Sequence, residues 1–537
     1  MSIDLSPDRS LSHQNAVIKL LLTFAATAIS MAALATFTLA GGAAPGAGEG
    51  IRPPNIVFIL ADDVSADELA PYGGAIAVPN LQRLADEGVL FGNGWSTPLC
   101  GPSRAMVMTG KYPHHTGYYE NHIPAPIEKD PRHLLILKML KEAGYTTSMI
   151  GKKHDGDDAD VGIYGADDWL VARYWDGYDG PVQNSWSPNR SGMYGISWYW
   201  HPGLVRNGKG VPTTASDFGP DLEVDHLLGF AGANKNRPFA ALWMTNLPHK
   251  AHDETCPADR QWYYTDVPKL DAQGKPTGGK VSGSLRSNMQ YLDHLLGRLR
   301  AGLAGQGLAG NTIIFFSADN GTADIRGRNK VMDKNSYDRD DGIRVPFVVG
   351  GGPVKPRGSS DVLVDFTDFW PTFAQLAGYR SAMNTDGQGF APYLLGEPFT
   401  PRETIRMAMN NARWVRDRNW LLDGRGRFHD TRGATNREEY RDVSESEDPE
   451  IVAARKRFEM YLREIPLPIE NDPATRQAWQ RFRALPEGAP VKVFRPAYLK
   501  RNGESTPAKE VIHQGTRSTG KANSGRSAPL YHGKIDS

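Results

Sequence analysis

Short apolar runs alternate with amphipathic stretches along most of the chain. Apart from its first residue, the run Asn55–Ala61 is continuously apolar, which is typical of a strand buried on both faces of a sheet. Similar runs predict strands at Tyr145–Ile150, Phe239–Thr245, Thr312–Ser317 and Val345–Val349. Amphipathic stretches predict helices at Pro79–Glu87, Pro131–Ala143, Ser287–Leu303 and Asp365–Ala377. Strands alternating with helices predict an α/β fold whose large, mostly parallel sheet is sandwiched by helices.

The pattern changes after about Gly396. Arg406–Asp423 predicts two short strands, and Asp448–Leu462 predicts a helix with charged residues on its outer face. Beyond about residue 496 the composition is dominated by Lys, Arg, Gly, Ser and Thr. We therefore expect a separate unit at 397–495 and a largely disordered tail at 496–537.

An apolar segment lies near the N-terminus, at Leu20–Ala40, and a Gly/Ala/Pro-rich stretch follows it at 41–50. Arg9 and Lys19 precede the segment, and small residues near Ala40 suit a cleavage site, so we expect an export signal. The segment is longer than a usual signal core, so an uncleaved membrane anchor is the alternative. Residues 1–50 are thus assigned to a signal peptide or anchor with its linker, and we expect a periplasmic or secreted protein.

Charge and cysteine content narrow the class of protein. The 537 residues include 61 Lys plus Arg and 61 Asp plus Glu, so the formal net charge is zero and nothing suggests nucleic-acid binding. The length allows two domains with a large core. The two cysteines, Cys100 and Cys256, could pair, but two thiols do not make a disulfide framework.

Polar clusters follow four of the predicted strands directly. They are Asp62-Asp63, Gly151 to His154, Asn246 to His249, and Asp319 to Gly321. In open α/β sheets, ligands bind beyond the carboxyl ends of the strands. These distant segments therefore predict one active site.

The run Cys100-Gly101-Pro102-Ser103-Arg104 precedes a short apolar stretch, and Thr109-Gly110 closes the same segment. Ser103 is a candidate cap for a helix over Ala105–Met108, which would place Cys100 just before a helix N-terminus. Arg104 adds a positive charge, so the place suits an anion or a nucleophile. The thiol alone would more often be a small buried hydrophobe.

This run resembles the sulfatase signature Cys-x-Pro-Ser-Arg followed by Thr-Gly, and the resemblance extends from about Pro54 to about Gly396. It implies the type I, formylglycine-dependent sulfatases of the alkaline phosphatase superfamily. In that family the Cys is oxidised by a maturation enzyme to Cα-formylglycine, whose hydrated aldehyde is the nucleophile. A disulfide would consume Cys100, so we expect none. The resemblance also implies a catalytic domain at 51–396 and a smaller C-terminal α+β domain with a short antiparallel sheet and a helix.

A metal site is predicted from oxygen ligands at two strand ends, namely Asp62, Asp63, Asp319 and Asn320. Oxygen-only ligand sets favour Ca²⁺ or Mg²⁺ over Zn²⁺. Each pair alone would be an ordinary solvated turn. The resemblance implies one Ca²⁺ ion, in preference to Mg²⁺, held by these four residues and by the formylglycine at Cys100.

The resemblance also assigns roles in binding and proton transfer. It implies that Arg104 holds the formylglycine, that Lys152 binds the sulfate, and that His154 lies beside the formylglycine diol. His249 would be the acid for the leaving group, in preference to His252, and Lys334 a second sulfate-binding lysine. The sequence departs from the family pattern at Lys153, which replaces a Trp, and at Asp338–Asp341, which replaces a shorter Glu-Gly segment.

The function implied is hydrolysis of sulfate monoesters. The region Asp157–Lys235 is expected to determine the substrate, and it holds the tryptophans Trp169, Trp175, Trp186, Trp198 and Trp200. Their rings could stack on sugars, which favours a sulfated carbohydrate over an aryl sulfate, or they could simply pack under long loops. The alternatives are a formylglycine-dependent phosphodiesterase or phosphonate monoester hydrolase, and an inactive secreted binding protein on a sulfatase fold.

Overall fold

The structure is a computed structural model. It describes residues 52–119, 121, 127–154, 161–172, 198–250, 264–322, 340–409, 412–424, 426–434 and 440–465, together with three short strands beyond them. The expected export signal, Lys334 and Cys256 lie outside the described residues. No helix in the described part of the chain combines the length and apolar character needed to cross a bilayer.

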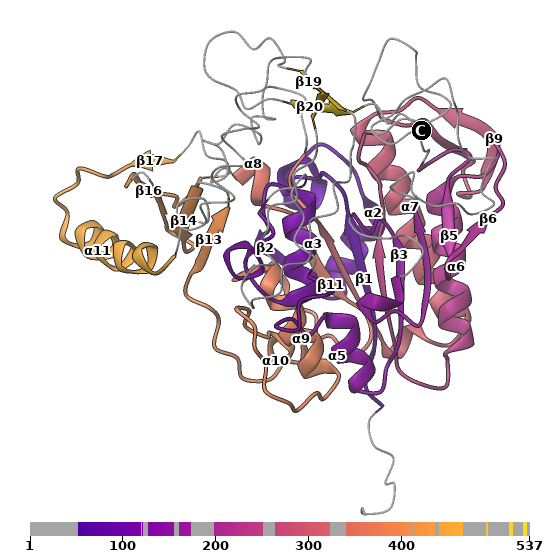
Figure 1. Ribbon diagram of the computed structural model, residues 1–537, viewed down its shortest axis with the longest axis horizontal. Coiled ribbons are helices and arrows are strands. Elements are labelled where there is room, and N and C mark those ends of the chain that lie inside the picture. Colours follow the sequence, from indigo (N-terminus) through magenta and orange to yellow (C-terminus); the bar gives the residue numbers. More distant parts are fainter. Residues whose placement is uncertain are drawn as a thin grey trace, which may run out of the picture. The chain divides into compact units, whose positions relative to one another are not determined.

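A ten-stranded mixed sheet forms the centre of the fold, in the order β12-β2-β11-β10-β1-β7-β3-β4-β5-β6 (Figure 1). Its strands are β1 (Asn55–Ala61), β2 (Val89–Trp95), β3 (Thr146–Gly151), β4 (Asp168–Ala172), β5 (Leu204–Arg206), β6 (Lys209–Val211), β7 (Phe239–Met244), β10 (Thr312–Ala318), β11 (Phe347–Gly350) and β12 (Gly358–Asp365). The neighbours β10, β1, β7, β3 and β4 are parallel, whereas β11, β5 and β6 pair in the antiparallel sense. The predicted α/β class with a mixed, mostly parallel sheet is confirmed.

Strand β1 explains why the sheet is so apolar. All seven of its residues are buried, and they align with β10 on one side (Ile56 opposite Ile313) and with β7 on the other (Ile56 opposite Ala240). A parallel strand with helices over both faces has no solvated side, so its sequence is a continuous apolar run rather than an alternating one.

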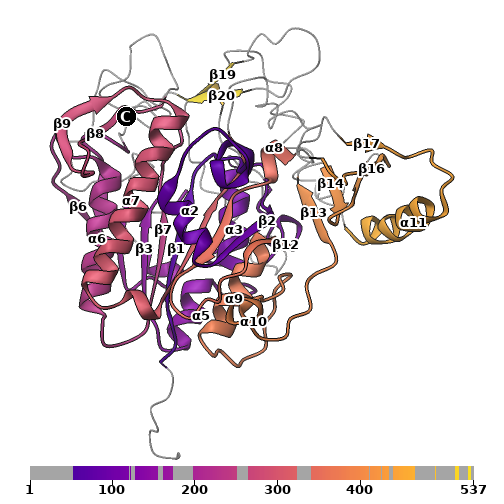
Figure 2. The same ribbon diagram turned by 180° about the vertical axis from the view of Figure 1, so that it is seen from behind.

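Helices cover both faces of this sheet (Figures 1 and 2). One group packs together as α2 (Pro79–Asp86), α6 (Gly219–Ala233) and α7 (Leu285–Gly305), and the other as α3 (Cys100–Thr109), α5 (Ile136–Glu142) and α9 (Phe369–Leu376). Shorter elements are α4 (Pro113–Thr116), α8 (Asp340–Ile343), α10 (Ala391–Leu395) and the hairpin of β8 (Val267–Leu270) and β9 (Pro276–Val281).

Two predicted helices differ from the structure at their starts. The prediction began α5 at Pro131, but the helix begins at Ile136 because Asp130 accepts from the backbone N–H of Arg132 (2.9 Å) in a turn. Helix α7 begins two residues earlier than predicted, at Leu285, because Ser284 and Ser287 form a capping box.

Helix α3 corrects a third expectation. It begins at Cys100, with Leu99 as the N-cap residue, so Cys100 lies in the first turn rather than before the helix. The Ser103 hydroxyl does not cap the helix but lies 2.6 Å from the Thr97 hydroxyl. The Gly101 N–H instead donates to Asn121 Oδ1 (2.9 Å). All ten residues of α3 are buried, which leaves it no polar face.

The C-terminal part forms a small antiparallel sheet with a helix, as the resemblance implied. The segment Arg406–Asp423 was predicted to hold two strands, but it holds most of three. The whole sheet has five strands: β13 (Ile405–Met409), β14 (Ala412–Arg416), β15 (Trp420–Asp423), β16 (Phe428–Asp430) and β17 (Arg441–Asp442). Helix α11 (Pro449–Glu464) is capped by Asp448 and shares a separate apolar cluster with this sheet, which includes Phe428 and Phe458. Farther along, β18 (Pro490–Val491), β19 (Gly515–Ser518) and β20 (Leu530–Gly533) pair in another small sheet, and the other residues of 496–537 lie outside the described part.

A buried carboxyl group joins α6 to the sheet. Trp243 Nε1 donates to Glu223 Oε2 (2.8 Å), and Glu223 is 1% exposed. Burial raises the pKa of Glu223 to about 7, although hydrogen bonds from Trp243 and Thr245 oppose the rise. The carboxyl group of Glu223 therefore binds its proton more tightly in the native state than in the unfolded state.

We predict that Glu223→Gln makes the protein less sensitive to rising pH. The stabilisation from a raised pKa is complete below the unfolded value near 4.5 and is lost as the pH rises through about 7. The free energy of unfolding of the variant, relative to the parent, should therefore rise by about 3 kcal/mol between pH 4.5 and 8. Denaturant unfolding at several pH values measures this, with exposed Glu403→Gln as the control. Parallel pH curves for parent and Glu223→Gln would contradict the prediction.

Candidate active site

The predicted polar clusters meet at one edge of the sheet. Strands β10, β1, β7 and β3 are consecutive parallel neighbours, so their carboxyl ends lie side by side. Asp319 follows β10 and Asp62 follows β1, whereas His249 follows β7 and Lys152 follows β3. The convergence predicted from four separate segments is present in the structure.

Arg104 joins three of these strand ends. Its Nε and Nη2 donate to Asp319 Oδ2 (3.0 and 2.8 Å), and Nη2 also lies 3.3 Å from Asp62 Oδ2. Its Nη1 donates to the backbone carbonyl of Lys152 (3.0 Å). The resemblance implied that Arg104 holds position 100, and its hydrogen bonds go to Asp319, Asp62 and the Lys152 carbonyl, which surround Cys100. Arg104 thus acts on the strand ends that surround the thiol.

Two more groups turn toward Asp62. Lys152 Nζ lies 2.5 Å from Asp62 Oδ2, and Cys100 Sγ lies 3.5 Å from Asp62 Oδ1. Lys152 is 1% exposed, so it is not the solvated surface lysine that is the commonest case for this residue type. Cys100 is a free cysteine and is buried.

Asp63 connects the remaining residues. Its backbone N–H donates to Asp319 Oδ1 (3.2 Å), and Asn320 Nδ2 donates to Asp63 Oδ1 (2.6 Å). His249 Nε2 lies 3.6 Å from Asp63 Oδ2. Asp63 has φ +66°, a left-handed conformation that a non-glycine residue keeps only where its surroundings hold it.

The carboxyl groups repel one another within this buried site. Burial and then the charges of Asp62 and Asp319 raise the pKa of Asp63 well above its usual range. Burial and then Asp62 raise the pKa of Asp319 to about 6. Burial also favours the neutral form of Asp62, but Lys152, His249 and Arg104 outweigh it and hold the pKa of Asp62 below its usual range. If all three buried carboxyl groups were ionised, their negative charge would exceed the positive charge of Arg104 and Lys152.

The site suits a further cation. Asp62, Asp63, Cys100 and His249 each offer one ligand atom, and these four atoms lie within 4.8 Å of one another. Among the residues that the structure describes, no donor lies within hydrogen-bond distance of the buried Asn320 Oδ1. A cation here would relieve the carboxylate repulsion and use this oxygen. The group shares Asp62, Asp63 and Cys100 with the predicted ligand set, and it adds His249, which the sequence had suggested only as an acid.

The end of β3 directs Lys152 and His154 toward the site. Gly151 has φ +86°, and a Cβ placed on it would lie 2.3 Å from the carbonyl oxygen of Met244. This close approach lets the Lys152 N–H donate to the same carbonyl (2.5 Å) and turns the chain into the site. His154 follows, buried and with φ +81°. Burial lowers the pKa of His249 to about 4, although Asp62 opposes the shift.

Two of the tryptophans expected to face the substrate are buried instead. Trp198 is 3% exposed and packs edge-on against His249, with ring centroids 5.6 Å apart. Trp200 is 6% exposed and donates from Nε1 to the Asp266 carbonyl (2.7 Å). The burial of these two agrees with the packing alternative, Trp169 in β4 is half-buried, and Trp175 and Trp186 lie outside the described residues.

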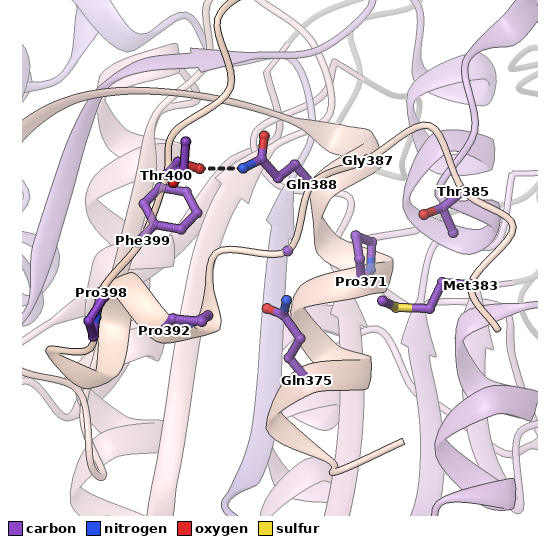
Figure 3. Close-up of a pocket in the computed structure, with 11 residues that line it drawn as sticks. Pro371, Gln375, Met383, Thr385, Gly387, Gln388, Pro392, Pro398, Phe399 and Thr400 are labelled. Carbon is purple, nitrogen blue, oxygen red and sulfur yellow. Dashed lines mark hydrogen bonds between the residues drawn. The ribbon is translucent and has the colours of Figure 1, made fainter. Parts of the chain in front are cut away.

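A pocket of about 470 Å³ lies elsewhere, between α9 and the segment that follows it (Figure 3). Its lining carries no charged group and consists of Pro371, Gln375, Met383, Thr385, Gly387, Gln388, Gly389, Pro392, Pro398, Phe399 and Thr400. Gln388 Nε2 donates to the Thr400 carbonyl across it. None of the predicted site residues lines this pocket, so it is separate from the cluster at the strand ends.

Comparison with known proteins identifies the family. The family model described as Sulfatase matches residues 54–379, which is more than half of the chain. The chain belongs to the sulfatase family. The predicted family, within the alkaline phosphatase superfamily, is thereby confirmed, and with it the class of sulfuric ester hydrolases.

Curated sulfatases and solved structures agree with this membership. The chain is 30% identical to arylsulfatase A of Bos taurus over 70% of its own length and 74% of that protein. It is 27% identical to N-acetylgalactosamine-6-sulfatase of Canis lupus familiaris over 66% and 69% of the two chains. The crystal structure of Ps i-CgsB in complex with k-i-k-neocarrahexaose shares the fold, with a TM-score of 0.58, 21% identity, and coverage of 81% of this sulfatase and 98% of that chain.

We predict that Gly151→Ala is much more destabilising than Gly144→Ala in this sulfatase. Both glycines have nearly the same φ (+86° and +87°), but only a Cβ at position 151 meets another atom, since nothing lies within 4 Å at position 144. The left-handed strain of about 1–2 kcal/mol is common to both. The clash with Met244 should add about 1–3 kcal/mol. Denaturant unfolding gives the two values, and equal losses would contradict the role of the close approach.

Proposed function

We propose that this sulfatase hydrolyses sulfate monoesters of a carbohydrate, using a formylglycine made from Cys100 and one Ca²⁺ ion. The observation that carries the proposal is the meeting of Cys100 with Asp62 (3.5 Å), Lys152 and Arg104 in a buried cluster that has an excess of carboxyl groups. Burial and then the charge of Asp319 raise the pKa of Cys100 well above its usual range, so the thiol stays protonated and is a poor nucleophile. Conversion of the thiol explains this arrangement better than direct thiolate attack does.

The proposed substrate class rests on the relatives. One of them is an N-acetylgalactosamine-6-sulfatase, and this favours a sulfated sugar. Arylsulfatase A is also among them, so an aryl sulfate is the second candidate within the same reaction class. Release of sulfate from a panel of defined sulfated sugars, with 4-nitrophenyl sulfate beside them, distinguishes the two substrates.

Two groups absent from the unmodified chain would complete the chemistry. A formylglycine at position 100 would supply a hydrated aldehyde as the oxygen nucleophile for sulfur. The Ca²⁺ ion would be held by Asp62, Asp63, Asp319 and Asn320. Its contribution would be to stabilise negative charge on the oxygen atoms bound to it. Both fit the cluster at the strand ends, because it holds three buried carboxyl groups beside Cys100.

The chain's own residues would bind the sulfate group and move protons. Lys152 would neutralise the sulfuryl oxygens together with Lys334, which lies outside the described residues. His249 would give a proton to the departing ester oxygen. The negative charge of a bound sulfate group would favour the protonated form of the His249 imidazole. His154 would accept a proton at position 100. Arg104 would keep Asp62 and Asp319 in place while charge develops.

A phosphodiester or phosphonate ester is the alternative substrate class, because its anionic oxygens would meet the same cations. Rates on an aryl sulfate and on the matching aryl phosphate or phosphonate separate the two classes. An inactive binding protein is disfavoured by the intact cluster of Cys100, Arg104 and the three aspartates. We also propose, from the N-terminal apolar segment, that the chain is exported and acts in the periplasm or outside the cell.

We predict that Cys100→Ala abolishes sulfate release while the protein stays folded. The substitution removes the thiol that the maturation enzyme would oxidise, so no aldehyde and no diol can form at position 100, and Ala suits the first turn of α3. Sulfate release is measured by ion chromatography and folding by circular dichroism. Mass spectrometry of the parent, expressed with a formylglycine-generating enzyme, should show an aldehyde in the peptide that spans position 100. Undiminished turnover by Cys100→Ala would refute the proposed nucleophile.

We predict that Ca²⁺ raises the thermal midpoint of the metal-stripped protein, because an ion that binds only the native state stabilises it. Asp63→Asn should weaken Ca²⁺ binding by about tenfold or more, since it removes one charged ligand. Asp221→Asn is the control, because this carboxyl group pairs with Tyr291 and Arg298 away from the site. Calorimetric titration gives the affinities. Equal Ca²⁺ affinity in both variants would count against the site.

A further inference from the structure

His249 stands at the end of a turn, Asn246–His249, whose middle is tied to the end of β1 because the Asp62 N–H donates to the Leu247 carbonyl (3.0 Å). The turn follows β7, and its own backbone bond runs from His249 N–H to the Asn246 carbonyl (2.7 Å). The side-chain amide of Asn246 is buried and, among the described residues, has no hydrogen-bond partner. The contact from Asp62 reaches the middle of the turn, so the positions of its two ends depend on other contacts to the Asn246 and His249 carbonyls.

Tyr199 contacts both ends of the turn. Its hydroxyl lies 2.8 Å from the Asn246 carbonyl and 2.6 Å from the His249 carbonyl, so it spans both ends of the turn. One hydroxyl proton serves two acceptors here, and the side chain is fully buried. A buried hydroxyl held between two carbonyl oxygens restricts their separation, and with it the direction of the His249 side chain.

Tyr199 is itself held rigidly. Its carbonyl accepts from the Gly219 N–H (2.7 Å) at the first residue of α6, and its ring stacks on Phe218 with centroids 6.0 Å apart. A Cβ on Gly219 would lie 2.4 Å from the Trp198 carbonyl oxygen, so the chain approaches α6 as closely as a glycine allows. The tyrosine is thus anchored to a 15-residue helix.

The neighbouring residue contacts the site from the same side. The Trp198 ring meets His249 edge-on at 5.6 Å, and Lys152 Nζ lies 5.9 Å from the centroid of that ring. The pair Trp198-Tyr199 therefore limits both the imidazole and the ammonium that the proposed reaction uses.

We propose that Tyr199 is a positioning residue, which sets the His249 imidazole for proton donation to the leaving group. This inference rests on the proposed role of His249. Tyr199 touches no reacting atom, and it acts through the two backbone carbonyls that it bridges. Misplacement of a proton donor by a fraction of an ångström slows only those reactions that need the proton.

The experiment compares Tyr199→Phe with Tyr145→Phe. Both tyrosines are buried and both donate to a backbone carbonyl, but Tyr145 bonds Pro54 (2.8 Å) at the opposite end of β3. Hydrogen exchange, followed by mass spectrometry, should become faster in the peptide spanning Thr245–Lys250 in Tyr199→Phe and stay unchanged in Tyr145→Phe. This readout needs no activity, so it decides the structural role of Tyr199 even if the protein acts on another ester.

The effect of Tyr199 on proton donation is tested with two aryl sulfates that have different leaving groups. A phenol departs poorly without a proton, whereas 4-nitrophenol needs little help. The kcat/KM of phenyl sulfate divided by that of 4-nitrophenyl sulfate should fall about tenfold in Tyr199→Phe and in His249→Ala, and it should not change in Tyr145→Phe. This ratio is independent of the folded fraction of each preparation.

An unchanged ratio or unchanged exchange in Tyr199→Phe would overturn the inference while leaving the sulfatase proposal intact. An unchanged ratio in His249→Ala would instead overturn the acid role of His249, and the catalytic role of Tyr199 with it. Absence of sulfate release by the parent protein from any ester would overturn the proposed function itself.

Discussion

The active site depends on the ion pairs that Arg104 makes at the buried end of the sheet. This guanidinium, carried by α3, contacts Asp319 after β10, Asp62 after β1 and the Lys152 carbonyl after β3. Burying one such charge without a partner would cost several kcal/mol, about 3–5 in cases where one partner of a buried pair has been removed. The helix that carries Cys100 and the ends of three strands must therefore assemble together.

This arrangement does not maximise stability. The raised pKa values of Asp63 and Asp319 show that repulsion among the carboxyl groups persists after Arg104 and Lys152 have paired. Asp63 and His154 both keep left-handed backbone conformations that cost free energy in non-glycine residues. Repulsion among carboxyl groups at one place is typical of a cation-binding site without its ion, because a bound cation would relieve it.

Sequence patterns predicted the elements whose signals are local. Strand β1 could be recognised because burial on both faces leaves a continuous apolar run. Strand β2 was missed because its sequence VLFGNGW contains two glycines and an asparagine, and β12 because its first half, GSSD, is polar and mostly exposed. The order of strands in the sheet depends on pairings between residues far apart in the chain, such as Asn55 with Thr312, and no local pattern contains that information.

The same distinction separates the site residues that were found from those that were missed. Asp62, Lys152, His249 and Asp319 were recognisable because each follows a predicted strand within a few positions. Their mutual contacts could not be predicted from local patterns, and neither could the ion pairs of Arg104 with Asp62 and Asp319.

Tyr199 shows why some functional contacts leave no trace in a sequence. It lies in a segment without a recognisable motif, and its hydroxyl meets the backbone carbonyls of Asn246 and His249. Every residue has a carbonyl group, so the acceptor side of such a contact places no requirement on residue type. A motif can identify the groups that carry out chemistry, because their side chains are constrained. The groups that orient them through the backbone become visible only when the tertiary structure brings the segments together.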